Sequence, residues 1–202
     1  MHAVIFDIDG TLLQSVSVDD DLYQQAVRHA LPGAHIRSSL ADYDYVSDSG
    51  ILAQILEDNA VSAGKEVAGE IQAKFVELLS RHIEKSGAFA EIPGAMRFLQ
   101  HHIESPDHAV AYATGGWRAS ARLKLSAAGF DRFDIPLASA DDAPERKDIM
   151  LQALSRLGDS FKSITYYGDG PWHRASSQQL GWNFVAFGAT LGGLESYEGL
   201  LR

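Results

Sequence analysis

The sequence predicts an α/β protein, a doubly wound parallel sheet into which an all-helical segment is inserted. Short apolar runs alternate with amphipathic helical patterns, as expected for parallel strands that are covered on both faces. Near the N-terminus, three helical patterns follow one another with no strand pattern between them, which indicates the insert. We therefore expect a sheet domain formed by residues 1–14 and 91–202 and a helical domain formed by residues 15–90.

Five apolar runs are the expected strands, and the first is Val4-Ile5-Phe6. The later strands are expected within residues 108–116, 133–141, 163–170 and 182–189. Helices of the sheet domain are expected at 94–104, 118–129 and 148–158, and those of the insert at 19–31, 50–60 and 66–86. Residues 32–50 are the one long loop-like stretch, and such loops in compact domains are often functional.

Composition narrows the classes of partner and of chemistry. The 202 residues, 46% of them hydrophobic, suffice for one domain with a smaller insert. A formal charge of −10 without a basic stripe argues against nucleic acid and anionic membranes as partners. The absence of cysteine excludes disulfides and thiolate catalysis. With no apolar run of membrane-spanning length and no room for a signal peptide before the first strand, we expect a soluble cytoplasmic monomer or homodimer.

Polar side chains follow the predicted strands at the points where these end. Asp7 and Asp9 follow the first strand, Thr114 the second and Asp169 the fourth. Lys147 lies in the loop before the helix that follows the third. Ligands of open parallel sheets bind beyond the carboxyl ends of the strands, so these side chains are expected to converge there.

Such a group of side chains fits phosphoryl transfer. One carboxylate can attack phosphorus, and a second carboxyl group can protonate the leaving oxygen and later deprotonate water. Two acids this close do not both ionise easily, which pushes one towards the protonated form that a general acid needs. A divalent cation bound by Asp7 and Asp169 would keep the nucleophile ionised. Hydroxyl, ammonium and glycine N–H groups would then hold the phosphoryl oxygens.

These residues lie in four short motifs that resemble, in order, the motifs of the haloacid dehalogenase superfamily of phosphohydrolases. The resemblance covers essentially the whole chain, and its Rossmann-like core is the fold that it implies. The insert between the first and second motifs resembles the type-1 helical cap of phosphoglycolate-phosphatase-like members. The four motifs are DIDGTLL (7–13), YATGG (112–116), ERKD (145–148) and YYGDG (166–170).

The resemblance implies a magnesium-dependent phosphatase that hydrolyses a small phosphorylated metabolite through an aspartyl-phosphate intermediate. Asp7 would be the nucleophile, and Asp9 the general acid and base. The phosphoryl group would be bound by Thr114, Gly115 and Lys147, and Mg²⁺ by Asp7, Asp9 and Asp169.

Several assignments within this interpretation have alternatives. Arg146 stands beside Lys147, and either could be the cation that binds phosphate while the other is a solvated surface charge. Within residues 42–50, the side chains of Tyr43, Tyr45 and Asp48 could close over the site and select the substrate, or they could simply cap the loop.

The function also has alternatives. Asp9 argues against a true dehalogenase, but a phosphomutase of the beta-phosphoglucomutase kind would use the same pair of acids. A non-catalytic phosphate-binding or regulatory protein is the third possibility, and His173 suggests it. This histidine stands where many relatives carry a second acid at the metal site, so we expect weak magnesium binding. Trp117 is expected in the core, and the pair His101-His102 at the surface.

Overall fold

The fold is built on a five-stranded parallel sheet with the strand order β3-β2-β1-β4-β5. It was obtained as a computed structural model, which describes residues 1–62, 64–158 and 160–201. The strands are β1 (His2–Phe6), β2 (His108–Ala113), β3 (Leu137–Ala138), β4 (Ile164–Gly168) and β5 (Asn183–Ala186). The prediction of an α/β parallel sheet is confirmed, although the strand expected within 133–141 is only two residues long.

Helices cover both faces of the sheet, so the doubly wound prediction is confirmed. Successive strand residues point to opposite faces, and the buried residues divide accordingly. Val4 and Phe6 of β1 lie in the cluster beneath α4 and α5, whereas Ile5 lies in the cluster beneath α6 and α7. The bounds are α4 (Ala95–Glu104), α5 (Arg118–Ala127), α6 (Arg146–Ser155) and α7 (Pro171–Leu180). Because β1 is covered on both sides, its sequence is a continuous apolar run.

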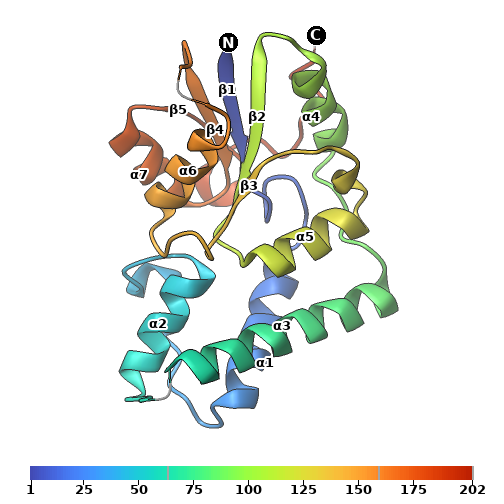
Figure 1. The fold of residues 1–202 in the computed structure, drawn as a ribbon. Helices are drawn as coiled ribbons and strands as arrows, with labels where there is room; N and C mark the ends of the chain where they lie inside the picture. The colour runs from blue at the N-terminus through green and yellow to red at the C-terminus, as the bar shows by residue number, and fades with distance from the viewer. Residues whose placement is uncertain (63, 159, 202) are drawn as a thin grey trace.

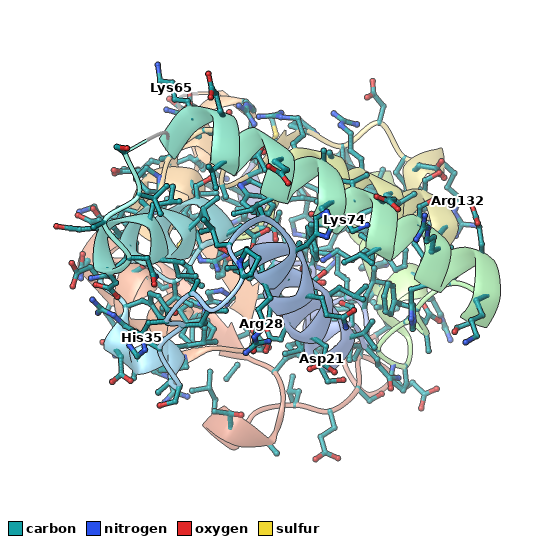
Figure 2. All side chains as sticks on the ribbon, turned by 90° about the horizontal axis from the view of Figure 1, so that it is seen from below. Asp21, Arg28, His35, Lys65, Lys74 and Arg132 are labelled. Atoms are coloured by element: carbon teal, nitrogen blue, oxygen red, sulfur yellow. The ribbon has the colours of Figure 1, made fainter. Side chains whose placement is uncertain are left out.

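Three further helices lie beyond the carboxyl ends of the strands (Figure 1). They are α1 (Val16–Ala30), α2 (Asp48–Asp58) and α3 (Gly64–Ser86), and each begins two or three residues earlier than predicted. For α2 the reason is a cap: the Ser47 hydroxyl accepts a hydrogen bond from Gly50 N–H at 3.1 Å. In the view from below, α3 crosses the molecule from Lys65 towards Arg132 (Figure 2).

The insert shares a hydrophobic cluster with one face of the sheet. Helix α3 packs against both α1 and α5. The Trp117 ring, at the start of α5, stacks on Tyr23 of α1 with ring centroids 5.4 Å apart and meets the edge of Phe75 of α3 at 5.8 Å. Burial of Trp117 confirms the expectation that it belongs to the core. The division into two domains, 1–14 with 91–202 and 15–90, stays a prediction.

The histidine pair of α4 is divided between surface and interior. His101 is exposed as expected, but His102 is partly buried, with its ring 4.4 Å from that of Phe98 and 4.7 Å from that of His108.

Among the helices that the structure describes, none has both the length and the apolar character needed to cross a bilayer.

Candidate active site

The residues after three adjacent strands meet in one cavity of about 410 Å³ between the sheet and the insert. Asp7 follows β1, Thr114 follows β2 and Asp169 follows β4, and all three line this cavity. The strand order places β1 between β2 and β4, which explains why residues far apart in the sequence converge. Asp7 N–H still donates to the Tyr167 carbonyl at 3.0 Å, so its backbone is fixed by the sheet.

Asp7 lies at the bottom of the cavity beside a guanidinium group. Its side chain is buried, and Arg146 Nη1 lies 3.5 Å from its Oδ1 atom. Burial raises the pKa of the Asp7 carboxyl well above its usual range; the Arg146 charge counters this rise, while Asp169 and Asp9 add to it. A positive charge at this place therefore favours the ionised form of the Asp7 carboxyl group.

Of the two adjacent cations, Arg146 lines the cavity and Lys147 does not. The Lys147 ammonium pairs with Glu145 at 3.0 Å, and Lys147 is absent from the cavity lining. The two residues begin α6, where consecutive side chains are turned about 100° around the helix, so that only one can face Asp7. The sequence argument favoured Lys147, because the direction of a helix start relative to the sheet cannot be obtained from spacing alone.

Two of the motif glycines are explained by close contacts. A Cβ atom on Gly115 would lie 2.0 Å from Arg146 Nη2, so the guanidinium rests directly on the backbone there. Gly10 has a φ of +72°, and a Cβ atom on it would lie 2.1 Å from Asp169 Oδ2. Both glycines thus make room for a charged side chain of the cavity.

Thr114 and Asp9 approach each other across Gly116. Measured from the position of a Cβ atom built on Gly116, Thr114 Oγ1 is 3.4 Å away, and Asp9 Oδ2 and Asp48 Oδ2 are each 3.8 Å away. The Thr114 hydroxyl accepts a hydrogen bond from Gly116 N–H at 3.0 Å. Its own proton is therefore available to a ligand oxygen.

The other oxygen of Asp9 is held by a lysine that the sequence argument missed. Lys124 Nζ lies 2.6 Å from Asp9 Oδ1 and 2.5 Å from Asp19 Oδ1, and the Ser15 hydroxyl also donates to Asp9 Oδ1. The Lys124 side chain is fully buried; burial alone would lower its pKa, but Asp19 and Asp9 raise it overall. One signal was present: Lys124 follows Ala121 at helical spacing, on the buried face of α5.

Of the three residues of the 42–50 loop that could close over the site or simply cap the loop, the structure brings only Asp48 into the cavity. Asp48 N–H donates to the Gly115 carbonyl at 2.7 Å, and its carboxyl group accepts from Trp117 N–H at 2.9 Å. Burial, followed by the Asp19 charge, raises the pKa of Asp48 well above its usual range. Tyr43 is buried outside the cavity, where its hydroxyl accepts from Arg37 N–H, and Tyr45 is exposed at the surface.

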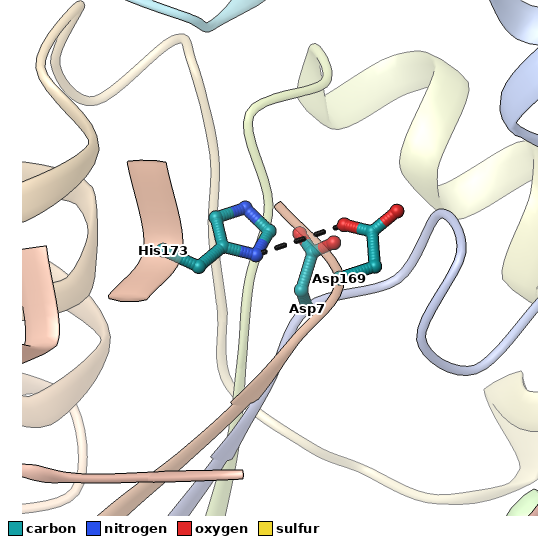
Figure 3. Close-up of side chains that lie close together, drawn as sticks. All are labelled: Asp7, Asp169 and His173. Carbon is teal, nitrogen blue, oxygen red and sulfur yellow. Dashed lines mark ion pairs between the residues drawn. The ribbon is translucent and has the colours of Figure 1, made fainter. Parts of the chain in front are cut away.

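A group of possible metal ligands lies at the β4 side of the cavity (Figure 3). Asp7, Asp169 and His173 each offer one ligand atom, and these atoms all lie within 4.8 Å of one another. Burial raises the pKa of Asp169 to about 6 and lowers the pKa of His173 well below its usual range. Both ring nitrogens of His173 are buried, and neither has a hydrogen-bond partner among the residues that the structure describes. The donor set therefore fits a divalent cation, with His173 in the group where Asp9 was expected.

Comparison with known proteins places this geometry in context. A family model described as haloacid dehalogenase-like hydrolase matches residues 1–181. No curated protein matches the sequence. Among solved structures, a hydrolase from Pseudomonas syringae has a TM-score of 0.71 and 21% identity, covering 92% of this chain and 84% of the other.

Two further solved structures share the fold. CbbY from Rhodobacter sphaeroides, in complex with phosphate, has a TM-score of 0.64 and 19% identity, covering 96% of this chain and 87% of the other. An archaeal beta-phosphoglucomutase from a hyperthermophilic Pyrococcus species has a TM-score of 0.57 and 16% identity, covering 93% of this chain and 87% of the other. At these identities the similarity concerns the fold.

Proposed function

Because the chain belongs to the haloacid dehalogenase-like hydrolase family, we propose that it is a phosphatase that hydrolyses a small phosphorylated metabolite through an aspartyl-phosphate intermediate. The observation that carries this proposal is the convergence of Asp7, Asp9, Thr114 and Arg146 on one cavity. These side chains supply a nucleophile, a proton donor and acceptor, and two groups that bind phosphoryl oxygens.

In the first step, one Asp7 carboxylate oxygen attacks phosphorus and the bond from phosphorus to the leaving oxygen breaks. The Asp9 carboxyl group gives its proton to that leaving oxygen. Thr114 and Arg146 bind the other phosphoryl oxygens, and the Arg146 charge stabilises the negative charge that develops on them. In the second step, Asp9 takes a proton from water, which attacks phosphorus; the bond to Asp7 breaks, and inorganic phosphate leaves.

The position of Asp9 suits both steps. Lys124 and Ser15 hold Oδ1, while Oδ2 lies on the side of Gly116 and Thr114. One oxygen thus fixes the carboxyl group, and the other is available to exchange the proton. A divalent cation held by Asp7, Asp169 and His173 would neutralise phosphate charge; magnesium is the ion that the family resemblance implies.

The experiment is phosphate release from a panel of phosphorylated metabolites and from p-nitrophenyl phosphate, with magnesium and with EDTA. Asp7→Asn is expected to abolish release while the protein stays folded, because an amide does not attack phosphorus. Asp9→Asn is expected to lower turnover of alkyl phosphates by about 10²–10⁴-fold, and that of p-nitrophenyl phosphate much less, since its anion leaves unaided.

The same panel tests the alternatives. Interconversion of sugar phosphates with little net phosphate release would indicate a phosphomutase. Absence of turnover on every substrate and with every cation, combined with phosphate binding, would indicate a binding protein. Equal losses of Asp9→Asn on both types of ester would remove the proton-transfer role of Asp9.

A further inference from the structure

His173 is a buried imidazole without a hydrogen-bond partner in the described part of the chain. The residue is 1% exposed, and within residues 1–62, 64–158 and 160–201 neither Nδ1 nor Nε2 has such a partner. The rings of Tyr166 and Trp172 meet it edge-on, with centroids 5.4 and 5.7 Å away. A Cβ atom on Gly168 would lie 2.2 Å from Nδ1, so the end of β4 leaves room for this ring.

Burying a polar group without a partner is costly, so such a group calls for a bound species. A neutral imidazole has one nitrogen that donates a proton and one that carries a lone pair. The lone pair needs a donor or a cation. The neighbouring carboxylates of Asp7 and Asp169 supply no donor when ionised, whereas a cation between them is a common partner for that lone pair and for both carboxylates.

The distances favour a shared ion over a direct hydrogen bond. His173 Nδ1 lies 3.8 Å from Asp169 Oδ1, which is too far for a hydrogen bond (Figure 3). Two ligand atoms bound at about 2.0–2.2 Å to one ion lie at most about 4.4 Å apart. The nitrogen and the carboxylate oxygen are thus at a separation that one small cation can bridge.

We propose that His173 is a direct nitrogen ligand of the cation bound with Asp7 and Asp169, and that it shifts the preference of this site from magnesium towards first-row transition metals such as Mn²⁺ and Co²⁺. Magnesium prefers oxygen ligands, whereas imidazole suits the transition metals, whose affinity rises from Mn²⁺ to Co²⁺ at most sites. The inference rests on the proposed function only for the presence of a cation at this place.

The decisive measurement is pulsed electron paramagnetic resonance of Mn²⁺ bound to the full chain. A directly coordinated imidazole gives ¹⁴N coupling, which is expected in the wild type and absent in His173→Asp. This measurement does not depend on catalytic activity. The wild-type spectrum alone tests the proposal, even if a variant fails to fold. A bound Mn²⁺ spectrum without ¹⁴N coupling in the wild type would overturn the proposal.

The metal affinities of the wild type and of two variants provide a second test. Dissociation constants for Mg²⁺ and Co²⁺ are measured by calorimetry for the wild type, His173→Asp and His173→Asn. His173→Asp is expected to move the ratio of the two constants towards magnesium by about tenfold or more, a change in the range that altered metal surroundings produce. His173→Asn supplies an oxygen without a charge, so it separates the loss of nitrogen from the gain of charge. An unchanged ratio in both variants would contradict the proposal.

The two proposals fail in different ways. Phosphate release with magnesium, together with Mn²⁺ bound without nitrogen coupling, would overturn the role of His173 and leave the phosphatase standing. Nitrogen coupling without hydrolysis of any ester under any metal would support the role of His173 and overturn the phosphatase.

Discussion

Replacing Lys124 by methionine should destabilise the fold strongly, because the change leaves two carboxylates without their partner. Lys124 is fully buried, and the side chains of Asp9 and Asp19 are only 18% and 13% exposed. Removing one partner of a buried ion pair typically costs about 3–5 kcal/mol. For a chain of this length, about 3 kcal/mol corresponds to a melting temperature lower by about 6–12 °C.

The loss of stability caused by Lys124→Met should depend on pH, and the direction of this dependence follows from the pKa of the buried carboxyl group of Asp19. Burial raises the pKa of Asp19 to about 7 even with Lys124 present, and loss of the ammonium raises it further. A carboxyl group whose pKa is higher in the folded than in the unfolded state binds protons preferentially when folded, so the fold loses stability as pH rises above the unfolded value of about 4. The deficit of Lys124→Met should therefore be larger at pH 8 than at pH 5.

The assay is urea unfolding followed by circular dichroism at both pH values. The matched control is Lys74→Met, which removes a lysine from the surface pair with Glu77 and should cost less than about 1 kcal/mol. The double variant Lys124→Met with Asp19→Asn should recover part of the lost stability. If Lys124→Met unfolds at the wild-type urea concentration at pH 8, the reasoning about this buried cluster is refuted.

Three further changes test other parts of the structure. Arg146→Ala should lower kcat/KM for phosphate esters by about 10²-fold or more, since it removes the cation beside Asp7. Lys147→Ala should change kcat/KM little, because Lys147 does not line the cavity. Similar losses in both variants would contradict the assignment of Arg146. Asp48→Asn should alter the ranking of natural substrates, while Tyr45→Phe should not, because only Asp48 lines the cavity; an unchanged ranking in both would remove this loop as the selective element. Burial lowers the pKa of His102 to about 4, so the unfolded state takes up more protons and the stability of the fold should decrease as pH drops from about 6.5. In His102→Asn, the melting temperature should depend less on pH over this range. An identical pH profile in the variant would show that His102 does not cause the dependence.

Strand-end residues could be predicted from the sequence because their position depends on chain order alone. Asp7, Thr114 and Asp169 each follow a continuous apolar run, and parallel strands bring such positions to one edge. Local patterns thus sufficed for the sheet, for α4, α5 and α6 and for three helices between the first two motifs, whereas α7 was not predicted. The sequence patterns predicted the ends of helices and strands less well, as β3 shows, which is only two residues long.

The remaining features depend on tertiary packing that no local pattern records. Whether Arg146 or Lys147 faces Asp7 is decided by the rotation of α6, which follows from how the whole helix packs on the sheet. Lys124 is recognisable only once α5 is known to face Asp9 and Asp19, which lie more than a hundred residues earlier. The burial of His173 likewise depends on its close approach to the Gly168 backbone and on the direction of the Tyr166 ring, neither of which the sequence supplies.

The residues at the start of α2 are hydrogen-bonded to the segments that follow β2 and β3, and this has a consequence for the position of Asp48. The Ser47 hydroxyl donates to the Pro144 carbonyl at 2.6 Å, Asp48 N–H donates to Gly115, and Arg146 Nη2 donates to the Val46 carbonyl at 2.9 Å. At about 1 kcal/mol each, the three bonds together hold this segment by about 3 kcal/mol, so that it is detached in roughly one molecule in 150. The placement of Asp48 at the cavity therefore depends on Gly115 and Arg146, and a change at either residue should also disturb the segment that carries Asp48.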